Sequence, residues 1–216
     1  MLPGVIENSL ENAFGESLYK PKKLTVEVGA FPAAKMMLGK IDNIHIRAEG
    51  LKYESFFIDE AEFNFKNFTF NPLEVIMGNY QLSLNQPGSA RFTVSEKSLN
   101  DYLNLQGIPG TEDLNIKLLN DKIILESNIK FMGAIIPVTI SGYFQVKQGT
   151  IFFKASEVNL GKYDFGDVFK ERLKGNLNIN FAFDFLPVKM KVTALNLDNG
   201  HLILETRILA KENYKK

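Results

Sequence analysis

Several common features are missing from this sequence of 216 residues, and each absence excludes a class of structure. There is no cysteine, which excludes a disulfide framework and a thiolate metal site. Tryptophan is also absent, whereas phenylalanine occurs 18 times. This composition indicates an interior filled by aromatic rings that carry no hydrogen-bonding group. No run of about 18 apolar residues occurs and no signal-peptide pattern is visible, so the sequence predicts no membrane-spanning helix and shows no targeting segment.

An excess of charge of either sign is lacking as well. Lysine and arginine together number 25, and aspartate and glutamate together number 25. A dedicated nucleic-acid-binding protein needs a net basic face to neutralise phosphates. We therefore expect no nucleic-acid partner.

Signatures of catalysis are sparse. The two histidines, His45 and His201, each lie on the polar side of an alternating segment, without a second ligand at helical metal-binding spacing. No Gly-x-Ser-x-Gly elbow, P-loop or Gly-x-Gly-x-x-Gly motif occurs. We expect no enzyme, no metal and no cofactor, although a Ser-His-Asp arrangement assembled only in space is compatible with any sequence that contains these residues.

One stretch of the chain organises the rest. Two short apolar segments, Pro32–Gly39 and Pro72–Gly78, each open with proline and close with glycine. Proline suits the first turn of a helix and glycine the position just past its end, so each segment predicts a helix of one to two turns with an apolar tip. Between them, apolar and polar residues alternate over Ile44–Glu49 and again over Glu62–Lys66, which predicts strands with one buried face.

These segments carry a resemblance to a known family. The order of motifs is FPAAKMMLGKIDNIHIRAEG at 31–50, NPLEVIMG at 71–78, FTVSEKSLNDYL at 92–103 and, more weakly, FLPVKMKVTALNLDNGHLIL at 185–204. It resembles the LmeA-like phospholipid-binding family of bacterial envelope proteins over most of the chain, and no motif in it is catalytic. The resemblance implies phospholipid binding, a tubular lipid-binding-like fold and a location on the extracytoplasmic side of the cell envelope. It also leads us to expect that a signal or anchor precedes this sequence in the natural protein.

The remainder of the chain is predicted to be mostly β-structure within a single domain, 1–216. The amphipathic pattern predicts a first helix within residues 1–20, with Gly15 ending or loosening it, and a helix from the capping residue Ser95 to Leu105. Asn199-Gly200 is a hairpin signal, and residues 211–216 form a solvated tail. The predicted elements also include a helix and two strands, at Asp164–Lys174, Tyr80–Asn85 and Asn178–Phe185.

About ten strands and four or five short helices leave the helices too small to cover the apolar sheet face. A strand of twelve residues spans roughly 40 Å, whereas a helix of eleven residues spans about 16 Å. The sheet must therefore bury the remainder by curling or by folding over as a sandwich. We expect a β-dominated α+β fold in which a long, strongly curled antiparallel sheet wraps around a few short helices. Its elongated interior would accept acyl chains, unless phenylalanine and isoleucine fill it.

Three apolar segments are the candidate lipid contacts. On the first helix, one face carries residues that either line a lipid chamber or cap the core. The two Pro-to-Gly segments place methionines at their tips, which either form an adaptable rim for an acyl chain or pack against the sheet. The candidate lipid-binding residues are Ile6, Leu10, Phe14, Met36, Met37, Leu38, Val75, Ile76 and Met77.

A fourth apolar run, Phe131–Pro137, interrupts the alternation with continuous apolar residues and a glycine. If Gly133 forms a hairpin tip, the loop is exposed and suited to a membrane surface. If Gly133 is a bulge in a continuous strand, the same residues belong to the core. The candidate membrane-contact residues are Met132, Ile135 and Ile136.

Two kinds of function fit these patterns best. The first is non-catalytic binding or transfer of a phospholipid or another acyl-chain lipid, driven by apolar area removed from water. The second is a ligand-free structural or adaptor domain that binds an envelope protein through a strand edge or the Ile135-Ile136 loop. A hydrolase would need a nucleophile and a base close together in a cleft.

Overall fold

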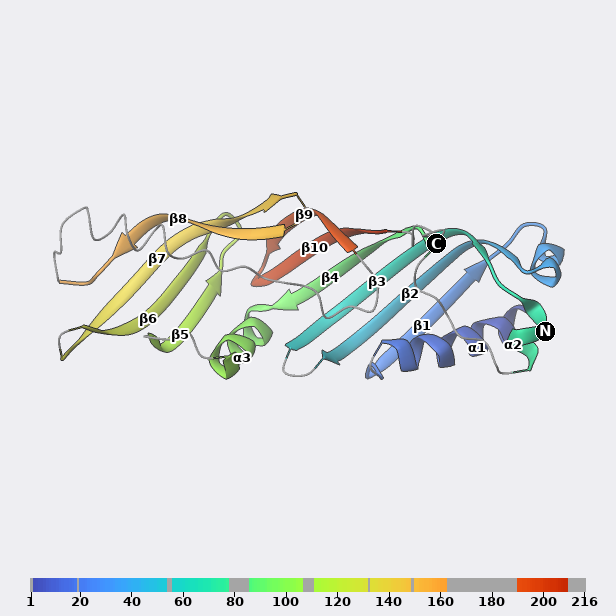
Figure 1. Ribbon diagram of the computed structural model, residues 1–216, viewed down its shortest axis with the longest axis horizontal. Coiled ribbons are helices and arrows are strands. Elements are labelled where there is room, and N and C mark those ends of the chain that lie inside the picture. The colour runs from blue at the N-terminus through green and yellow to red at the C-terminus, as the bar shows by residue number, and fades with distance from the viewer. Residues whose placement is uncertain are drawn as a thin grey trace, which may run out of the picture.

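The structure is a computed structural model, and Figure 1 shows an elongated molecule with two sheets arranged along its long axis. It describes residues 2–18, 20–53, 56–77, 86–106, 111–131, 133–148, 150–162 and 190–209. The predicted helix Asp164–Lys174, the predicted strands Tyr80–Asn85 and Asn178–Phe185, and the tail 211–216 lie outside these residues.

The larger sheet has six antiparallel strands in the order β1-β2-β3-β4-β10-β9. Its centre is a pair of long strands in which Ile46 lies opposite Phe63 and Ile44 opposite Phe65. The apolar residues of both strands therefore face the same side of the sheet. This register is the one that the period-two pattern of the sequence requires. The strands are β1 (Lys23–Gly29), β2 (Lys40–Tyr53), β3 (Phe56–Thr69), β4 (Gly88–Ser95), β9 (Met190–Asp198) and β10 (His201–Ile208).

The smaller sheet has four antiparallel strands in sequence order, β5-β6-β7-β8. The strands are β5 (Thr111–Leu118), β6 (Ile123–Phe131), β7 (Ala134–Lys147) and β8 (Thr150–Asn159). β9 of the larger sheet also contacts β7 and β8, which brings the two sheets side by side. The predicted hairpin at Asn199-Gly200 is confirmed, because these residues join β9 and β10.

Helix α1 (Leu2–Ser17) packs on the larger sheet next to β1. Its buried residues recur every four positions, as expected for a helix with one apolar face, and Phe14 stacks on Phe65 with ring centroids 6.2 Å apart. Of the two effects predicted for Gly15, ending the helix is contradicted, since the helix continues to Ser17. A Cβ at Gly15 would lie 3.7 Å from the Leu24 side chain, an ordinary van der Waals contact, so the helix lies close to β1 here.

Helix α3 (Glu96–Gln106) joins the two sheets, and Figure 1 shows it at their junction. The predicted cap is confirmed, because Ser95 Oγ accepts the Ser98 backbone N–H at 3.2 Å. From the larger sheet, Asp59 Oδ2 accepts the Ser95 backbone N–H at 2.6 Å. On the smaller sheet, the Asn100 side chain accepts from the Ile116 N–H at 2.7 Å and donates to the Ile116 carbonyl at 2.9 Å. The helix is therefore hydrogen-bonded to both sheets.

The expected β-dominated α+β class is confirmed, but the single curled sheet is not. The described strands form two antiparallel sheets, and neither closes on itself. The sequence argument assumed that all strands belong to one surface. Instead α3 follows β4 and separates the first four strands from the next four, while β9 and β10 return to the larger sheet.

Candidate functional site

One continuous apolar cluster runs through both sheets and supplies the interior. It includes residues from α1, α3 and all ten described strands. The three candidates on α1, Ile6, Leu10 and Phe14, are fully buried in this cluster on the face of the helix that meets the sheet. Their burial fits both interpretations of this helix, because a residue that lines a chamber and a residue that caps a core are equally hidden from water.

The first Pro-to-Gly segment forms the 3₁₀ helix η1 (Ala33–Leu38), which begins after the cis peptide Phe31–Pro32. Of its three consecutive large apolar residues, Met36 is buried in the core and Met37 and Leu38 are exposed. A 3₁₀ helix has three residues per turn, so only one residue in three can face the sheet. Gly39 ends the helix in the left-handed conformation, with φ of 69°, as the predicted closing glycine.

The second segment forms the short helix α2 (Pro72–Ile76). Its first turn is capped by Asn71, whose Oδ1 accepts the Leu73 backbone N–H at 3.1 Å. Leu73 and Met77 are exposed. Val75 and Ile76 lie on this helix, but their side chains are outside the part of the protein that the structure describes.

These two segments meet at one end of the molecule. The Phe70 backbone N–H donates to the Gly39 carbonyl at 2.9 Å, and η1, α2 and α1 are in mutual contact. Figure 1 shows this end at the right, beside the N-terminus. We call it the apolar end and define it by five residues that are each between 63 and 85% exposed, which are Phe31, Met37, Leu38, Leu73 and Met77.

Asp42, at the start of β2, fixes the chain that leads into the apolar end. Its carboxylate accepts the Phe31 backbone N–H at 2.7 Å and the Lys35 Nζ at 3.0 Å. These two donors, the backbone N–H first, lower the pKa of the Asp42 carboxyl below its ordinary value. One side chain thus positions both the residue before η1 and a residue within it.

The opposite end of the long axis carries the β6–β7 hairpin (Figure 1). Phe131 pairs with Ala134 across Gly133, whose φ is 82°, so the hairpin interpretation of this run is confirmed and the bulge interpretation was wrong. Ile135 is 56% exposed, but Ile136 is only 1% exposed and belongs to the core. The prediction that Ile136 contacts a membrane surface was wrong, because successive residues of a strand point to opposite faces. Met132 lies outside the described residues.

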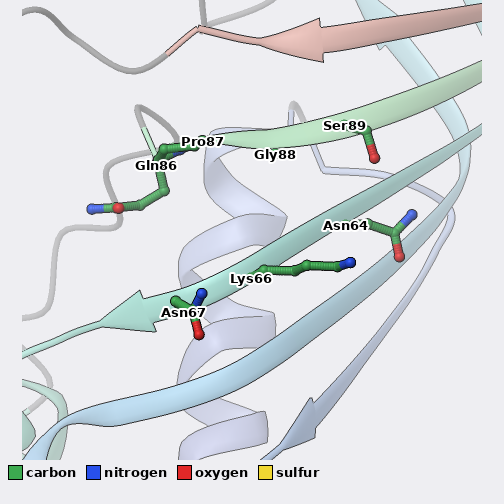
Figure 2. Close-up of a pocket in the computed structure, with 7 residues that line it drawn as sticks. All are labelled: Asn64, Lys66, Asn67, Gln86, Pro87, Gly88 and Ser89. Atoms are coloured by element: carbon green, nitrogen blue, oxygen red, sulfur yellow. The ribbon is translucent and has the colours of Figure 1, made fainter.

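A groove of about 520 Å³ lies where β3 and β4 diverge beyond the Phe65–Gly88 pair. Figure 2 shows its lining residues, which are Asn64, Lys66, Asn67, Gln86, Pro87, Gly88 and Ser89. Asn64 and Lys66 alternate with the buried Phe63 and Phe65, so the groove lies on the face of the sheet opposite to α1. Its lining supplies one cation and several neutral hydrogen-bonding groups, and none of the seven residues belongs to the apolar cluster.

The histidines have structural partners. His45 Nδ1 lies 2.9 Å from Asn64 Oδ1, and His201 Nδ1 lies 3.1 Å from the Asn199 carbonyl. Within the described part of the chain, no three histidine, aspartate or glutamate side chains gather closely enough to hold a metal ion. No described helix has both the length and the apolar character needed to cross a bilayer.

Sequence reasoning missed two residues of the apolar end. Phe31 and Leu73 each flank the proline that opens a segment, and both are strongly exposed. A large apolar residue beside a helix-opening proline, outside any alternating pattern, was the signal that could have identified them. The groove between β3 and β4 had no comparable signal, because it depends on where two strands separate.

Comparison with known proteins gives one finding. The profile of the LmeA-like phospholipid-binding family matches residues 1–207, nearly the whole chain. Searches of the curated proteins and of the solved structures each found no match. The family profile covers both sheets, the apolar cluster and the apolar end that the structure describes. The chain belongs to the LmeA-like phospholipid-binding family.

Proposed function

We propose that this protein binds a phospholipid, or another acyl-chain lipid, without catalysing a reaction, on the extracytoplasmic side of the bacterial cell envelope. The acyl chains enter the apolar interior between the sheets and helices, and the headgroup stays near the rim. The protein carries the lipid to or from a membrane surface. The observation that carries the proposal is membership of the phospholipid-binding family together with one apolar cluster that continues through both sheets.

The dimensions of the fold suit this ligand. β3 has 14 residues, which correspond to roughly 46 Å at about 3.3 Å per residue. One leaflet of a bilayer is roughly 15 Å of hydrocarbon, so an acyl chain is shorter than the apolar face of the larger sheet. Binding would be driven by removal of the acyl chain from water at roughly 25 cal/mol per Å².

Small residues at the centre of the larger sheet offer a place to test the interior. Ala48 and Ala61 lie opposite each other in β2 and β3, and both are fully buried on the apolar face. Substitution Ala61→Leu adds volume inward at this point. Thr69→Leu makes a side chain of the same size at an exposed position in the same strand, outside the groove, and serves as the matched control.

The experiment measures lipid bound to the purified protein by native mass spectrometry and by solvent extraction, and then uptake from vesicles. We expect phospholipid to co-purify with the parent and with Thr69→Leu. Ala61→Leu should hold less lipid while remaining folded by circular dichroism. Absence of co-purified lipid, combined with absence of uptake, contradicts the proposal and favours the adaptor alternative. Loss of folding in Ala61→Leu, without bound lipid in the parent, would indicate an interior filled by side chains.

A further inference from the structure

The apolar end exposes a cluster of large apolar side chains, whereas single exposed apolar residues are common on protein surfaces. Five large side chains, from η1, α2 and the residue before η1, are at least 63% exposed at one end of the molecule. Among the described residues these are half of the ten exposed large hydrophobic side chains. Together they present on the order of 500 Å² of apolar surface, and patches of more than a few hundred Å² typically mark an interaction site.

We propose that the apolar end is the surface by which this protein docks on a phospholipid bilayer, with Phe31, Met37, Leu38, Leu73 and Met77 inserted among the lipids. The inference rests on the proposed function, because a protein that loads or delivers phospholipid must meet a membrane. It assigns that meeting to η1 and α2 and not to the β6–β7 hairpin.

The shape of the apolar end fits a bilayer better than a rigid partner. Its exposed side chains lie on two short helical turns and the residue before one of them, and methionine and leucine adapt to the irregular surface between lipid chains. The area of about 500 Å² from these five side chains is entirely apolar, whereas a standard protein interface of roughly 800 Å² per partner is only a little over half apolar. A second copy of this chain is therefore a weaker occupant than a lipid surface.

The named charges around the apolar end balance, and one exposed lysine among them has no described acidic partner. Lys35 and Lys40 flank the exposed Met37 and Leu38, and Lys40 is exposed and forms no ion pair with another described residue. The nearest acidic group of β2, Asp42, is occupied by Lys35 and the Phe31 N–H, and α2 contributes Glu74. Lys40, beside the inserted Met37 and Leu38, is thus placed to meet a lipid phosphate, whereas Lys35 is held by Asp42.

The apolar end continues into the interior that the proposed function assigns to the ligand. Met36 is 3% exposed and belongs to the apolar cluster, while Met37 and Leu38 of the same helix are exposed. α2 and η1 also contact α1, which packs over the larger sheet. A bilayer at this end would therefore lie next to the core without an intervening polar layer on η1.

The absence of tryptophan allows a direct test of which end inserts. Phe31→Trp and Ile135→Trp each place a single tryptophan on an exposed apolar position, one at the apolar end and one at the hairpin. With vesicles of phosphatidylethanolamine and phosphatidylglycerol, we expect the emission of Phe31→Trp to shift to the blue and to be quenched by brominated acyl chains. The emission of Ile135→Trp should stay unchanged. Insertion at Ile135→Trp without insertion at Phe31→Trp overturns the proposal.

Vesicle binding of a surface variant gives the second measurement. We expect Met37→Ser combined with Leu38→Ser to weaken co-sedimentation with the same vesicles by about tenfold or more. Leu105→Ser, at an equally exposed position on α3, is the control and should bind as the parent does. Equal vesicle binding by the Met37/Leu38 variant and the parent overturns the proposal.

A short-chain phospholipid kept below its micelle concentration separates this inference from the proposed function. Phe31→Ser combined with Leu73→Ser changes two residues of the apolar end that are not candidate lipid-binding residues, so this variant should lose vesicle binding but still bind the monomeric lipid. A parent that binds the monomeric lipid but no vesicles refutes membrane docking and leaves lipid binding standing. A parent that docks on vesicles through these residues but binds no monomeric lipid supports docking and refutes the lipid carrier. A stable dimer that the same substitutions dissociate would assign the apolar end to a second copy and overturn the proposal.

Discussion

The two ends of the molecule carry similar apolar sequences but present very different surfaces. At one end, Met36-Met37-Leu38 lies on a 3₁₀ turn and leaves two of its three side chains in solvent. At the other end, Ile135-Ile136 lies at the start of β7 and leaves only one in solvent. The difference comes from local periodicity, because a strand buries every second residue whereas a short helical turn can bury one in three. Local geometry, more than composition, decides which apolar segment becomes a surface.

The largest expected effect distinguishes the core under α1 from the apolar end. Phe14 is fully buried on α1 against Phe65, whereas Phe31 is the most exposed large hydrophobic residue among those the structure describes. We expect Phe14→Ala to lower the free energy of unfolding by about 3–5 kcal/mol. Phe31→Ala should change it by no more than about 0.5 kcal/mol. Denaturant titration followed by circular dichroism measures both, and a large loss in Phe31→Ala would show that the apolar end is part of the core.

The hairpin allows the same comparison between adjacent residues. Ile136→Ala removes a core side chain and should cost about 2–5 kcal/mol of unfolding free energy, because the neighbouring residues cannot fully collapse into the space. Ile135→Ala removes a half-exposed side chain and should cost well under 1 kcal/mol. The same titration checks both variants. Similar costs for the two would contradict the assignment of Gly133 to a hairpin tip, since a bulge would change which isoleucine faces the core.

The next effect concerns the junction that holds the two ends in one molecule. Asn100 supplies both hydrogen bonds that α3 makes to the backbone of Ile116 on β5. Asn100→Ala leaves this N–H and carbonyl without their side-chain partners, and we expect a loss of about 1–3 kcal/mol. Asn104→Ala, at an exposed position on the same helix, is the control for helix propensity. Amide hydrogen exchange should show faster exchange at Ile116 in Asn100→Ala only.

Much of this architecture could be predicted from the sequence because its signals are local. The proline and glycine at the ends of both short helices, the alternation around Ile44 and Phe63, and the Ser95 cap each act within a few residues. The division into two sheets could not be predicted, because it depends on pairs such as Arg91 with Glu205, which lie 114 residues apart. Within the apolar end, residue type gave no way to rank Met36 against Met37. Only the direction in which η1 leaves the sheet makes one buried and the other exposed.

The smallest effect tests what holds the apolar end in shape. The pKa of the Asp42 carboxyl is lowered in the folded protein, mainly by the Phe31 N–H and then by Lys35. A carboxyl with a lowered folded-state pKa stabilises the fold above its unfolded pKa, and this contribution is lost as pH falls through the folded pKa. We therefore expect Asp42→Asn to be less stable than the parent at neutral pH. The difference should close as the solution is acidified through the lowered pKa.

The two donors to Asp42 can be separated by a second variant. Lys35→Gln removes the ion pair but leaves the Phe31 N–H bonded to Asp42, so its loss of stability at neutral pH should be smaller than that of Asp42→Asn. Thermal unfolding across a pH series measures both variants against the parent. If Asp42→Asn stays less stable by the same amount at acid pH, the contribution comes from shape and not from charge. In that case the carboxylate does not hold η1, and the exposure of Met37 and Leu38 must be set by Gly39 and its contact with Phe70 alone.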